Sequence, residues 1–472
     1  MNVFRMRAGK LEVIAFISGF VLMVFELVGA RILAPSIGSS TYVWTSVIGI
    51  IIMALSVGYW LGGKLADRRG YAVDIAWLAL ACAMAMTVML LTYEGVTTWV
   101  AESVEDPRLQ GIEASLLLFT PSSVLLGMIS PYLAKLKVRS LATTGRSIAS
   151  LSALNSVGGI TGTFVAGFIL FGMIGSRETL LIVIAMMVAI SWLVVPRHQW
   201  KLRSAISAVV LVVILIPVSA TSALQIDTPS ARYTIFERDN VRLLATGPYA
   251  AQSGMSLVYP NELVFWYTER LAQVVEQATN KQRILVLGGG AFTLPQYLAY
   301  KYPESVIDVV EIDPELAQIA RDHFRYHDPS NVRLIFDDAR VYVNKTQELY
   351  DIVLVDVYGD AHVPFTLLTS EYGQQIARIT ASHGVVAVNA IAGLENACRS
   401  QLEALDAPYR AQFANARYAI QRPHESRSNM ILIYSHQSEQ WRGTQMLDLP
   451  PKVAYTDNFV PAERLQHACR QQ

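Results

Sequence analysis

Charged residues are scarce in this chain of 472 residues. Asp, Glu, Lys and Arg together make up 16% of it, whereas typical soluble domains carry about 25%. The formal net charge is +0, so the chain as a whole lacks the excess of positive charge that is typical of nucleic-acid-binding proteins. Hydrophobic residues reach 53%. This composition indicates membrane lipid as a partner, and the length suffices for two large domains.

Cysteine is also scarce. The three cysteines are Cys82, Cys398 and Cys469, and no CxxC or Cys/His zinc spacing occurs, so no metal site is predicted. Cys398 and Cys469 would pair if their domain faces an oxidising compartment, where disulfides persist. Two unrelated free thiols are the alternative.

Long apolar runs fill the first half of the chain. The first run, Leu11–Leu33, is too long for a signal peptide and lacks a small-residue cleavage site, so we expect a retained helix. Others of roughly spanning length, about 20 residues, follow at Tyr42–Leu61, Val73–Tyr93, Ile112–Leu136, Ile148–Gly172, Leu180–Val195 and Ala205–Leu224. Residues 1–224 are therefore predicted to be a membrane domain of about seven helices.

Basic residues alternate between the connecting loops. They gather before the first helix and in the second, fourth and sixth loops, whereas the third loop is acidic and carries Glu94, Glu102, Glu105 and Asp106. Because Lys and Arg favour the cytoplasmic side, the N-terminus is predicted to be cytoplasmic. Seven spans then predict a multi-pass inner-membrane protein whose C-terminal domain is periplasmic.

One carboxylate, Glu26, lies inside the first apolar run. A carboxylate in hydrocarbon is costly and is by default a functional candidate. A structural pair with Arg31 or with a neighbouring helix is an equal alternative.

Hydropathy falls after residue 225. Residues 225–260 alternate like strands and predict a small β region, and residues 261–472 predict an α/β domain. In the latter, a buried strand runs into Gly288–Gly289–Gly290, and Glu311 ends the next strand about 20 residues on, which is the spacing of a Rossmann-like crossover. Thr293 replaces the third glycine of the dinucleotide fingerprint, which favours a nucleoside without a pyrophosphate.

Two further strands also end in acids. Asp338, followed by Ala339, comes after the strand at 332–336, and Asp356 comes directly after the strand at 350–355. Because ligands in open α/β sheets bind outside the carboxyl ends of the strands, these acids, Glu311 and the glycine turn are predicted to face one crevice.

These features together resemble spermidine synthases and the wider aminopropyltransferase family, over roughly residues 230–435. The matching segments are Gly288–Gly290, Val310–Pro314, Asp338–Ala339 and Tyr350–Asp356, with Gln252 and Tyr267–Leu271 upstream, where Thr268 replaces the family's histidine. Arg31–Pro35 and Tyr42–Gly49 look like the multi-pass membrane branch of that family. The implied fold is a polytopic helical domain followed by a methyltransferase-type α/β domain.

The resemblance implies that an amine attacks the carbon beside the sulfonium of decarboxylated S-adenosylmethionine and releases methylthioadenosine. The adenosyl compound is then a substrate, and no permanently bound cofactor is expected. By position, the glycine turn and Glu311 would hold the ribose, Asp338 and Ala339 the adenine, and Asp356 the amine. Gln252 and Tyr267 would line the cleft.

Two family acids are missing. Ala291 stands where an aspartate usually grips the aminopropyl ammonium, and Gly359 stands where a second acid follows the catalytic one, with Asp360 the nearest substitute. These departures fit a donor with a different terminal group, including intact S-adenosylmethionine.

Three functions are carried forward from the sequence. The first is a membrane-bound transferase that acts on a polyamine or another small amine. The second is a transporter or sensor whose soluble domain binds a nucleoside or polyamine, and the third is an S-adenosylmethionine-dependent methyltransferase. Membrane lipid is an expected partner, nucleic acid is not, and a homodimer is left open.

Overall fold

The computed structural model describes residues 8–38, 40–104, 106–138, 143–194, 199–215, 223–228, 230–246, 251–357, 364–437, 441–450 and 452–470. The chain forms two compact units, one comprising Met1–Ser222 with Ile226–Arg232 and the other Ala223–Gln225 with Tyr233–Gln472. We call them the helical unit and the α/β unit, and each is described by itself.

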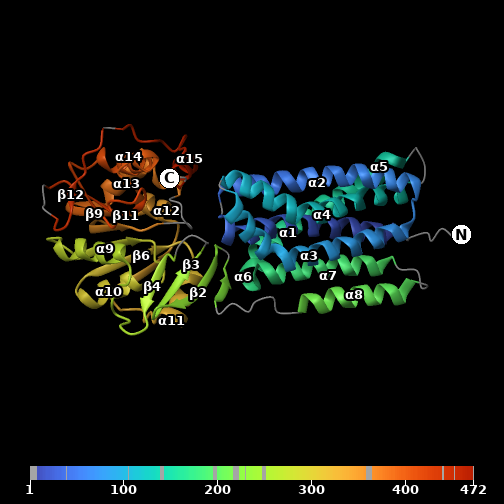
Figure 1. The fold of residues 1–472 in the computed structure, drawn as a ribbon, viewed down its shortest axis with the longest axis horizontal. Helices are drawn as coiled ribbons and strands as arrows, with labels where there is room; N and C mark the ends of the chain where they lie inside the picture. The colour runs from blue at the N-terminus through green and yellow to red at the C-terminus, as the bar shows by residue number, and fades with distance from the viewer. Residues whose placement is uncertain are drawn as a thin grey trace. The chain divides into compact units, whose positions relative to one another are not determined.

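The helical unit consists of long helices joined by short connections (Figure 1). They are α1 (Ala8–Ile37), α2 (Thr41–Arg68), α3 (Ala72–Ser103), α4 (Pro107–Lys137), α5 (Thr144–Val165), a π-helical turn η2 (Ala166–Leu170), α6 (Phe171–Met173), α7 (Gly175–Leu193) and α8 (Trp200–Leu215). Within the described residues, 6 helices are long and apolar enough to cross a membrane, with α5 and η2 forming one span. The predicted polytopic helical region is thereby confirmed.

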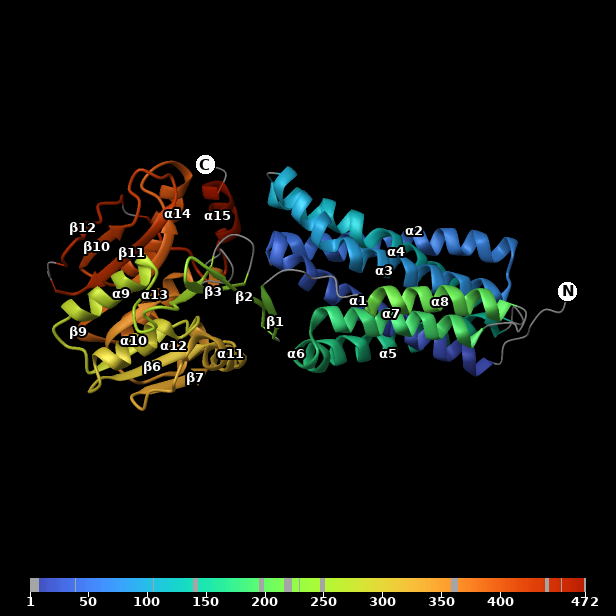
Figure 2. The same cartoon turned by 60° about the horizontal axis from the view of Figure 1, so that its bottom comes forward.

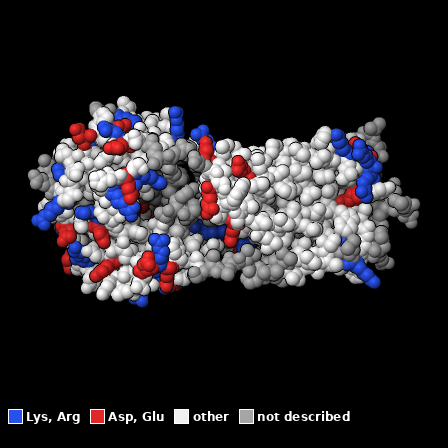
Figure 3. All heavy atoms as spheres, in the orientation of Figure 1, with Lys and Arg blue, Asp and Glu red and all other residues white. Residues whose placement is uncertain are grey.

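The seventh predicted span corresponds to α8, of which 16 residues are described. At about 1.5 Å per residue this helix is about 24 Å long, slightly less than a hydrocarbon core of about 30 Å. Residues 216–222, which would extend it, lie outside the described part of the chain. The face of the helical unit seen in Figure 3 is nearly free of charged side chains along its middle, as a lipid-facing belt requires.

Helix α1 is the centre of the helical unit, and small residues let α5 approach it closely. A Cβ atom on Gly158 would lie 2.0 Å from the Phe16 carbonyl oxygen, and one on Gly19 would lie 1.9 Å from that of Asn155. Close backbone contact of this kind replaces the hydrophobic driving force that helices lack in lipid. These distances show that the backbones of α1 and α5 are in close contact at both glycines.

Residues 226–232 attach to the helical unit at one end. Asp227 Oδ2 accepts the backbone N–H of Ser176 at the start of α7 (2.8 Å), and Arg232 Nε donates to Asp227 Oδ1 (2.6 Å). Arg31, near the C-terminal end of α1, donates to the Thr228 carbonyl oxygen. The chain therefore leaves the helical unit at the end opposite to the N-terminus of α1.

The α/β unit is built on an eight-stranded sheet with the order β12-β10-β11-β9-β8-β5-β6-β7. Five neighbouring strands pair in parallel, and β10, β11 and β12 pair antiparallel at one edge. The strands are β5 (Arg283–Leu287), β6 (Val306–Glu311), β7 (Val332–Phe336), β8 (Tyr350–Val355), β9 (Thr380–Ala392), β10 (Asn415–Ile420), β11 (Ser428–Ser435) and β12 (Gln445–Met446). This is the predicted methyltransferase-type arrangement. The segments Ile284–Leu287 of β5, Ile352–Val355 of β8 and Val385–Val388 of β9 are continuous buried apolar runs, as is typical of parallel strands.

Helices flank this sheet on both faces. They are α9 (Trp266–Gln277), α10 (Thr293–Lys301), α11 (Pro314–Phe324), α12 (Ala339–Lys345), the 3₁₀ turn η4 (Phe365–Leu367), α13 (Ser370–Ile379), α14 (Asn396–Arg410) and α15 (Ala462–Arg470). Helices α14 and α15 lie side by side (Figure 2), and a disulfide between Cys398 and Cys469 joins them. Of the two alternatives that the sequence left open, the structure has the pair.

A smaller sheet precedes the large one, with the order β1-β2-β3-β4. Its strands are β1 (Leu224–Asp227), β2 (Arg232–Arg238), β3 (Val241–Ala245) and β4 (Ser253–Ser256), which corresponds to the predicted small β region. Two of its side chains contact the loops that follow β5 and β6. Tyr233 Oη donates to Asp313 Oδ2 (3.0 Å), and Ser253 Oγ accepts the N–H of Ala291 (3.1 Å).

Candidate functional site

The carboxyl ends of four adjacent parallel strands carry most of the residues that the sequence singled out. Gly288 follows β5, Glu311 ends β6, Asp338 comes after β7, and Asp356 follows β8. In strand order these ends lie side by side as β8, β5, β6 and β7. The sheet therefore brings the glycine turn and the three acids to one edge, where α/β proteins of this type bind ligands.

The turn after β5 requires glycine at its first position. Gly288 has a φ of +97°, and a Cβ atom there would lie 2.2 Å from the carbonyl oxygen of Asp356. Its N–H donates to the Val310 carbonyl oxygen at 2.9 Å. The turn thus packs directly against Asp356, the residue after β8. Because glycine has no side chain, a ligand can approach the backbone of the turn closely.

Glu311 fixes the geometry of that turn. Its Oε2 accepts the N–H of Gly289 (2.8 Å), and its Oε1 accepts the N–H of Asp313 (3.0 Å). Burial raises the pKa of Glu311, and these two backbone donors partly offset the rise. Each carboxylate oxygen has a second lone pair, so the same side chain can also accept a pair of neighbouring hydroxyl groups.

Asp338 caps helix α12. Its Oδ1 accepts the N–H groups of Arg340 (2.8 Å) and Val341 (3.1 Å), and Ala339 is the first helical residue.

Ile312, directly after Glu311, is 60% exposed. An exposed isoleucine between two polar strand ends provides an apolar surface for a planar base, and the sequence analysis missed it.

Asp356 is the most perturbed acid of the group. Asn389 Nδ2, from β9, donates to its Oδ1 at 2.8 Å. Burial raises the pKa of Asp356 to about 6, the Asn389 hydrogen bond lowers it, and the nearby Glu311 charge raises it. A carboxylate with a pKa near 6 is ionised at neutral pH and is well matched to accept a proton from an amine.

Tyr267 and Gln252 lie near this acid. Tyr267, in the first turn of α9, donates from Oη to the Gln252 carbonyl oxygen at 2.6 Å. Burial and the Asp356 charge both raise the pKa of Tyr267, so it stays a neutral phenol. The side chain of Gln252 is turned toward Thr246, to which it donates a hydrogen bond.

Some predicted positions stand apart from this group. Asp360 and Gly359 lie outside the described residues. Ala291 is fully buried, and its N–H donates to Ser253 Oγ. Thr268, at the position of the family's histidine, is buried and donates to the Phe265 carbonyl oxygen at 2.8 Å.

Asn389 and Ser253 were not singled out from the sequence. Asn389 is the one polar residue in the apolar run Val385–Ala392 of β9, and that interruption is the signal that would have indicated it. Ser253 gives no comparable signal, because a serine beside a turn is common.

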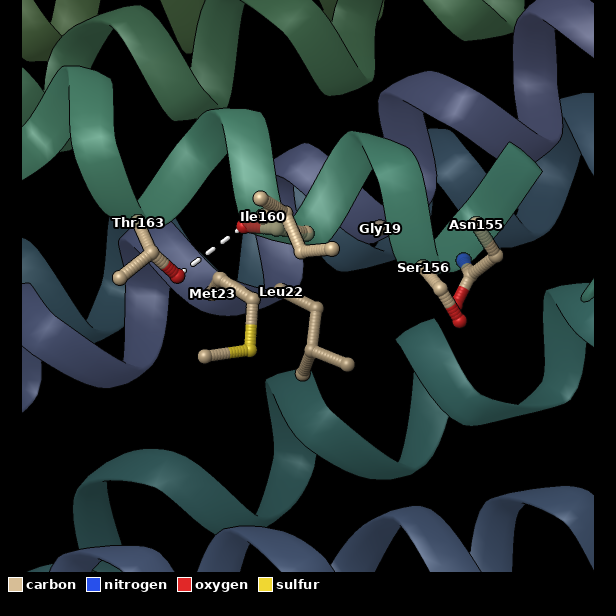
Figure 4. A pocket seen from close by; sticks show the side chains of 8 residues that line it. Gly19, Leu22, Met23, Asn155, Ser156, Ile160 and Thr163 are labelled. Carbon is tan, nitrogen blue, oxygen red and sulfur yellow. Dashed lines mark hydrogen bonds between the residues drawn. The ribbon is translucent and has the colours of Figure 1, made fainter. Parts of the chain in front are cut away.

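A second, separate feature lies inside the helical unit. A pocket of about 260 Å³ is lined by α1 and α5, through Gly19, Leu22, Met23, Asn155, Ser156, Gly159, Ile160 and Thr163 (Figure 4). Glu26 follows Met23 by three residues and Gly19 by seven, so it shares their face of α1. Among the described residues, no hydrogen bond or ion pair holds this carboxylate. The alternative of a pair with Arg31 is not found, because Arg31 donates to the Thr228 carbonyl oxygen and lies over the Phe171 ring.

Comparison with known proteins finds similar proteins for the part of the chain that forms the large sheet and its helices. Residues 264–439 match the family model of the spermine/spermidine synthase domain. A polyamine aminopropyltransferase of Vibrio vulnificus (strain CMCP6) is 34% identical over 155 residues, which are 32% of this chain and 50% of that protein. Putrescine N-methyltransferase 2 of Nicotiana tabacum is 31% identical over 134 residues, which are 27% of this chain and 37% of that protein.

Among solved structures, a probable spermidine synthase from Corynebacterium glutamicum ATCC 13032 is similar, with 24% identity and a TM-score of 0.42. The likeness covers 47% of this chain and 82% of that chain. The chain spans about half the length of the first curated relative that it matches. The C-terminal part of this chain therefore matches the spermine/spermidine synthase domain, and the helical unit lies outside that match.

Proposed function

We propose that this protein is a membrane-bound transferase that moves a group from an adenosyl-sulfonium donor to a polyamine or another small amine. The observation that carries the proposal is Asp356, a partly buried acid directly after β8 that lies against the glycine turn and near Glu311. A nucleoside site beside an acid of this pKa is what such a transfer needs. The match of residues 264–439 supports the same reaction class.

The proposed reaction is a single displacement. The amine nitrogen attacks the carbon next to the donor sulfonium, the carbon–sulfur bond breaks, and the sulfur keeps the electron pair as neutral methylthioadenosine. Asp356 orients the amine and accepts the proton that it loses, with Tyr267 beside it and Asp360 as a further acid. Glu311 and the turn Gly288–Gly290 hold the ribose, and Asp338, Ala339 and Ile312 hold the adenine. Alignment of the two reactants supplies much of the rate enhancement in reactions of this kind.

The donor is either decarboxylated S-adenosylmethionine or S-adenosylmethionine itself. Position 291 is an alanine and therefore offers no carboxylate to bind the aminopropyl ammonium group. This favours testing the intact compound alongside the decarboxylated one. The likeness to a protein named putrescine N-methyltransferase makes methyl transfer the competing chemistry.

The products distinguish these reactions. The purified full-length protein is incubated with each donor and with putrescine or spermidine, and nucleoside products are separated by chromatography. Methylthioadenosine together with a lengthened polyamine is the expected result. S-adenosylhomocysteine with a methylated amine would replace the proposal with methyl transfer, and neither product with either donor would refute both.

We also propose that the α/β unit faces the outside of the inner membrane. Three observations support this orientation. Basic loops gather on the side of the N-terminus, the chain leaves the helical unit at the opposite end through Asp227 and Thr228, and Cys398 is bonded to Cys469. Structural disulfides persist in the periplasm and are rare in the cytosol. Alkaline phosphatase fused to the C-terminus should then be active, whereas a green fluorescent protein fusion that glows would place the unit inside.

A transporter is the second candidate, and Glu26 is the observation that favours it. An unpaired carboxylate beside a pocket in a membrane span suits a cationic or proton-coupled solute. In proteoliposomes, Glu26→Gln should abolish polyamine uptake and leave nucleoside binding by the α/β unit intact. Glu178→Gln, which removes an exposed carboxylate at the start of α7, is the matched control. Equal uptake by wild type and Glu26→Gln would rule out this function.

A further inference from the structure

The acid at the end of β8 belongs to a chain of side chains that crosses three adjacent strands. Asn389 Nδ2 donates to Asp356 Oδ1 at 2.8 Å, and Asn429 Nδ2 donates to Asn389 Oδ1 at 3.4 Å. The strands are in register for this, because Val355 pairs with Val388 in β9 and Ile391 pairs with Asn429 in β11. The two asparagines and the acid therefore form one hydrogen-bonded row, which we call the amide row.

The order of donors and acceptors along the amide row determines that Asp356 receives an N–H group from Asn389. An asparagine side chain has a carbonyl acceptor at one end and an amide donor at the other. Asn429 occupies the acceptor end of Asn389, so the N–H end is turned toward Asp356. Asn389 is 6% exposed, and water does not compete freely for these groups. A hydrogen bond between a neutral donor and an ionised acceptor is stronger than one between neutral groups.

The other groups around Asp356 act against its ionisation. Burial and the negative charge of Glu311 raise its pKa, and Tyr267 uses its hydroxyl proton on the Gln252 carbonyl oxygen instead of on Asp356. Tyr358, Asp360 and His362, the next ionisable residues along the chain, lie outside the described part. Asn389 is thus the described group that favours the charged form.

We infer that Asn389 is a positioning residue for the transfer reaction, holding the Asp356 carboxylate ionised and aimed at the reacting amine. This inference rests on the proposed function, since it assigns Asp356 the role of proton acceptor. It adds a residue that does not touch either substrate. It also assigns Asn429 the role of keeping the Asn389 amide in the donating orientation.

The same sheet offers a matched control. Asn280 Nδ2 donates to Asp351 Oδ1 at 2.6 Å, near the opposite end of β8. It is the same type of bond, between the same two residue types, on the same strand, but away from the candidate site. A substitution there reports the general cost of losing such a bond.

The first experiment is a pH profile of kcat for the full-length protein in detergent, with wild type, Asn389→Leu, Asn389→Asp and Asn280→Leu. Loss of the donor should move the acidic limb of the Asn389→Leu profile upward by about one pH unit. Asn389→Asp should move the limb further, because it places a second carboxylate beside the first. Both variants should regain most of the wild-type kcat at pH 9, with the KM for the donor unchanged, and Asn280→Leu should keep the wild-type limb. An Asn389→Leu profile lowered equally at every pH would overturn the inference.

A second experiment does not depend on turnover. Asp356→Asn, Asn389→Leu and the double variant form a double-mutant cycle, measured by unfolding of the full chain at pH 8 and at pH 4.5. Coupling should be strong at pH 8, where Asp356 is ionised, and weaker at pH 4.5. Absence of coupling at pH 8 would overturn the inference even in an inactive protein. If the wild type releases no methylthioadenosine but shows this coupling, the proposed function is refuted, whereas the coupling between Asn389 and Asp356 is supported.

Discussion

At the scale of single residues, Asp356 combines its proposed chemical role with a cost in stability. Its pKa is raised from 3.8 to about 6 by burial. Between these two values the native state binds more protons than the unfolded state, so this group makes the protein less stable as pH rises. Above pH 6 the full cost of the buried charge is present. Keeping this acid ionised at neutral pH therefore lowers the folding stability, and a purely structural residue would have no reason to impose that cost.

The first prediction concerns Asp356→Asn. This variant should be more stable than wild type at pH 8 by about 2–3 kcal/mol, since each pKa unit corresponds to about 1.4 kcal/mol. The difference should shrink as pH falls and vanish near pH 4. Turnover should drop by about 10²–10⁴-fold, the usual contribution of a positioned base. Denaturant unfolding at several pH values, together with product release, checks both parts. A variant less stable than wild type at pH 8 would contradict the pKa assignment.

The second prediction concerns Glu311→Gln. Gln keeps one acceptor oxygen but loses the charge, so it cannot bind the N–H groups of Gly289 and Asp313 and two ribose hydroxyls at once. Affinity for methylthioadenosine should fall by about tenfold, equivalent to about 1.4 kcal/mol, in isothermal titration. Glu315→Gln, a neighbouring carboxylate in the first turn of α11, serves as the control and should bind normally. Equal losses in both variants would indicate a general charge effect.

Sequence reasoning was most effective where one residue carries its own signal. The glycine turn and the acids at strand ends are visible because the chain there alternates predictably between buried strand and loop. Asn389 was missed because its hydrogen bond to Asp356 depends on the strand order, which places β9 between β8 and β11. Cys398 and Cys469 are 71 positions apart, so only the folded structure reveals that they meet. Glu26 was placed correctly in a helix, but of its alternatives the pair with Arg31 is not formed, because Arg31 binds the Thr228 carbonyl oxygen.

At the scale of elements, the turn between β5 and α10 depends on the backbone conformation at Gly288. Gly288→Ala would put a Cβ atom 2.2 Å from the Asp356 carbonyl oxygen at a positive φ, and neither atom can move without displacing β8. Adenosyl binding should be lost, with destabilisation of more than about 2 kcal/mol. A fluorescent adenosyl ligand and thermal unfolding measure the two effects.

Gly289→Ala is the comparison within the same turn. Its Cβ would meet the outer atoms of the Phe292 ring at 2.6 Å, and a ring can give way more easily than backbone. This variant should be measurably milder than Gly288→Ala in both assays. If Gly288→Ala binds ligand as well as Gly289→Ala, the packing of the turn against Asp356 does not govern the site.

The helix pair α14 and α15 depends on its disulfide. The bond closes a loop of 71 residues, and chain-entropy arguments give about 4 kcal/mol of stabilisation for a loop of that length. Cys398→Ser with Cys469→Ser should lower the unfolding free energy of the α/β unit by up to this amount, and dithiothreitol should do the same to wild type but not to the variant. An unchanged midpoint in both experiments would show that packing of α15 alone suffices.

At the scale of the whole molecule, the three cysteines report where the α/β unit folds. Cys82 is buried in α3 as a free thiol, and the other two are bonded to each other. Protein taken from cells under thiol-trapping conditions and then denatured should react with one maleimide, and with three after reduction. Three reactive thiols before reduction would contradict folding in an oxidising compartment.

An α/β unit outside the membrane would need its adenosyl donor to cross from the cytoplasm, where such compounds are made with ATP. The proposed orientation thus links the two candidate functions, because a helical unit that delivers substrate would serve the transferase. Uptake measured with Glu26→Gln and turnover measured with Asp356→Asn separate the two contributions in one protein.

The division of the chain near β1 has a practical consequence. Residues 223–225 belong to the α/β unit, residues 226–232 to the helical unit, and Tyr233 onward to the α/β unit again. A fragment that begins at Tyr233 would lack β1 and leave β2 as an unprotected edge, which invites aggregation. A fragment that begins at Ala223 would carry Asp227 and Arg232 without Ser176, the residue that Asp227 binds. Recombinant production of the α/β unit alone will therefore need redesign of this junction, and expression of the full chain avoids the problem.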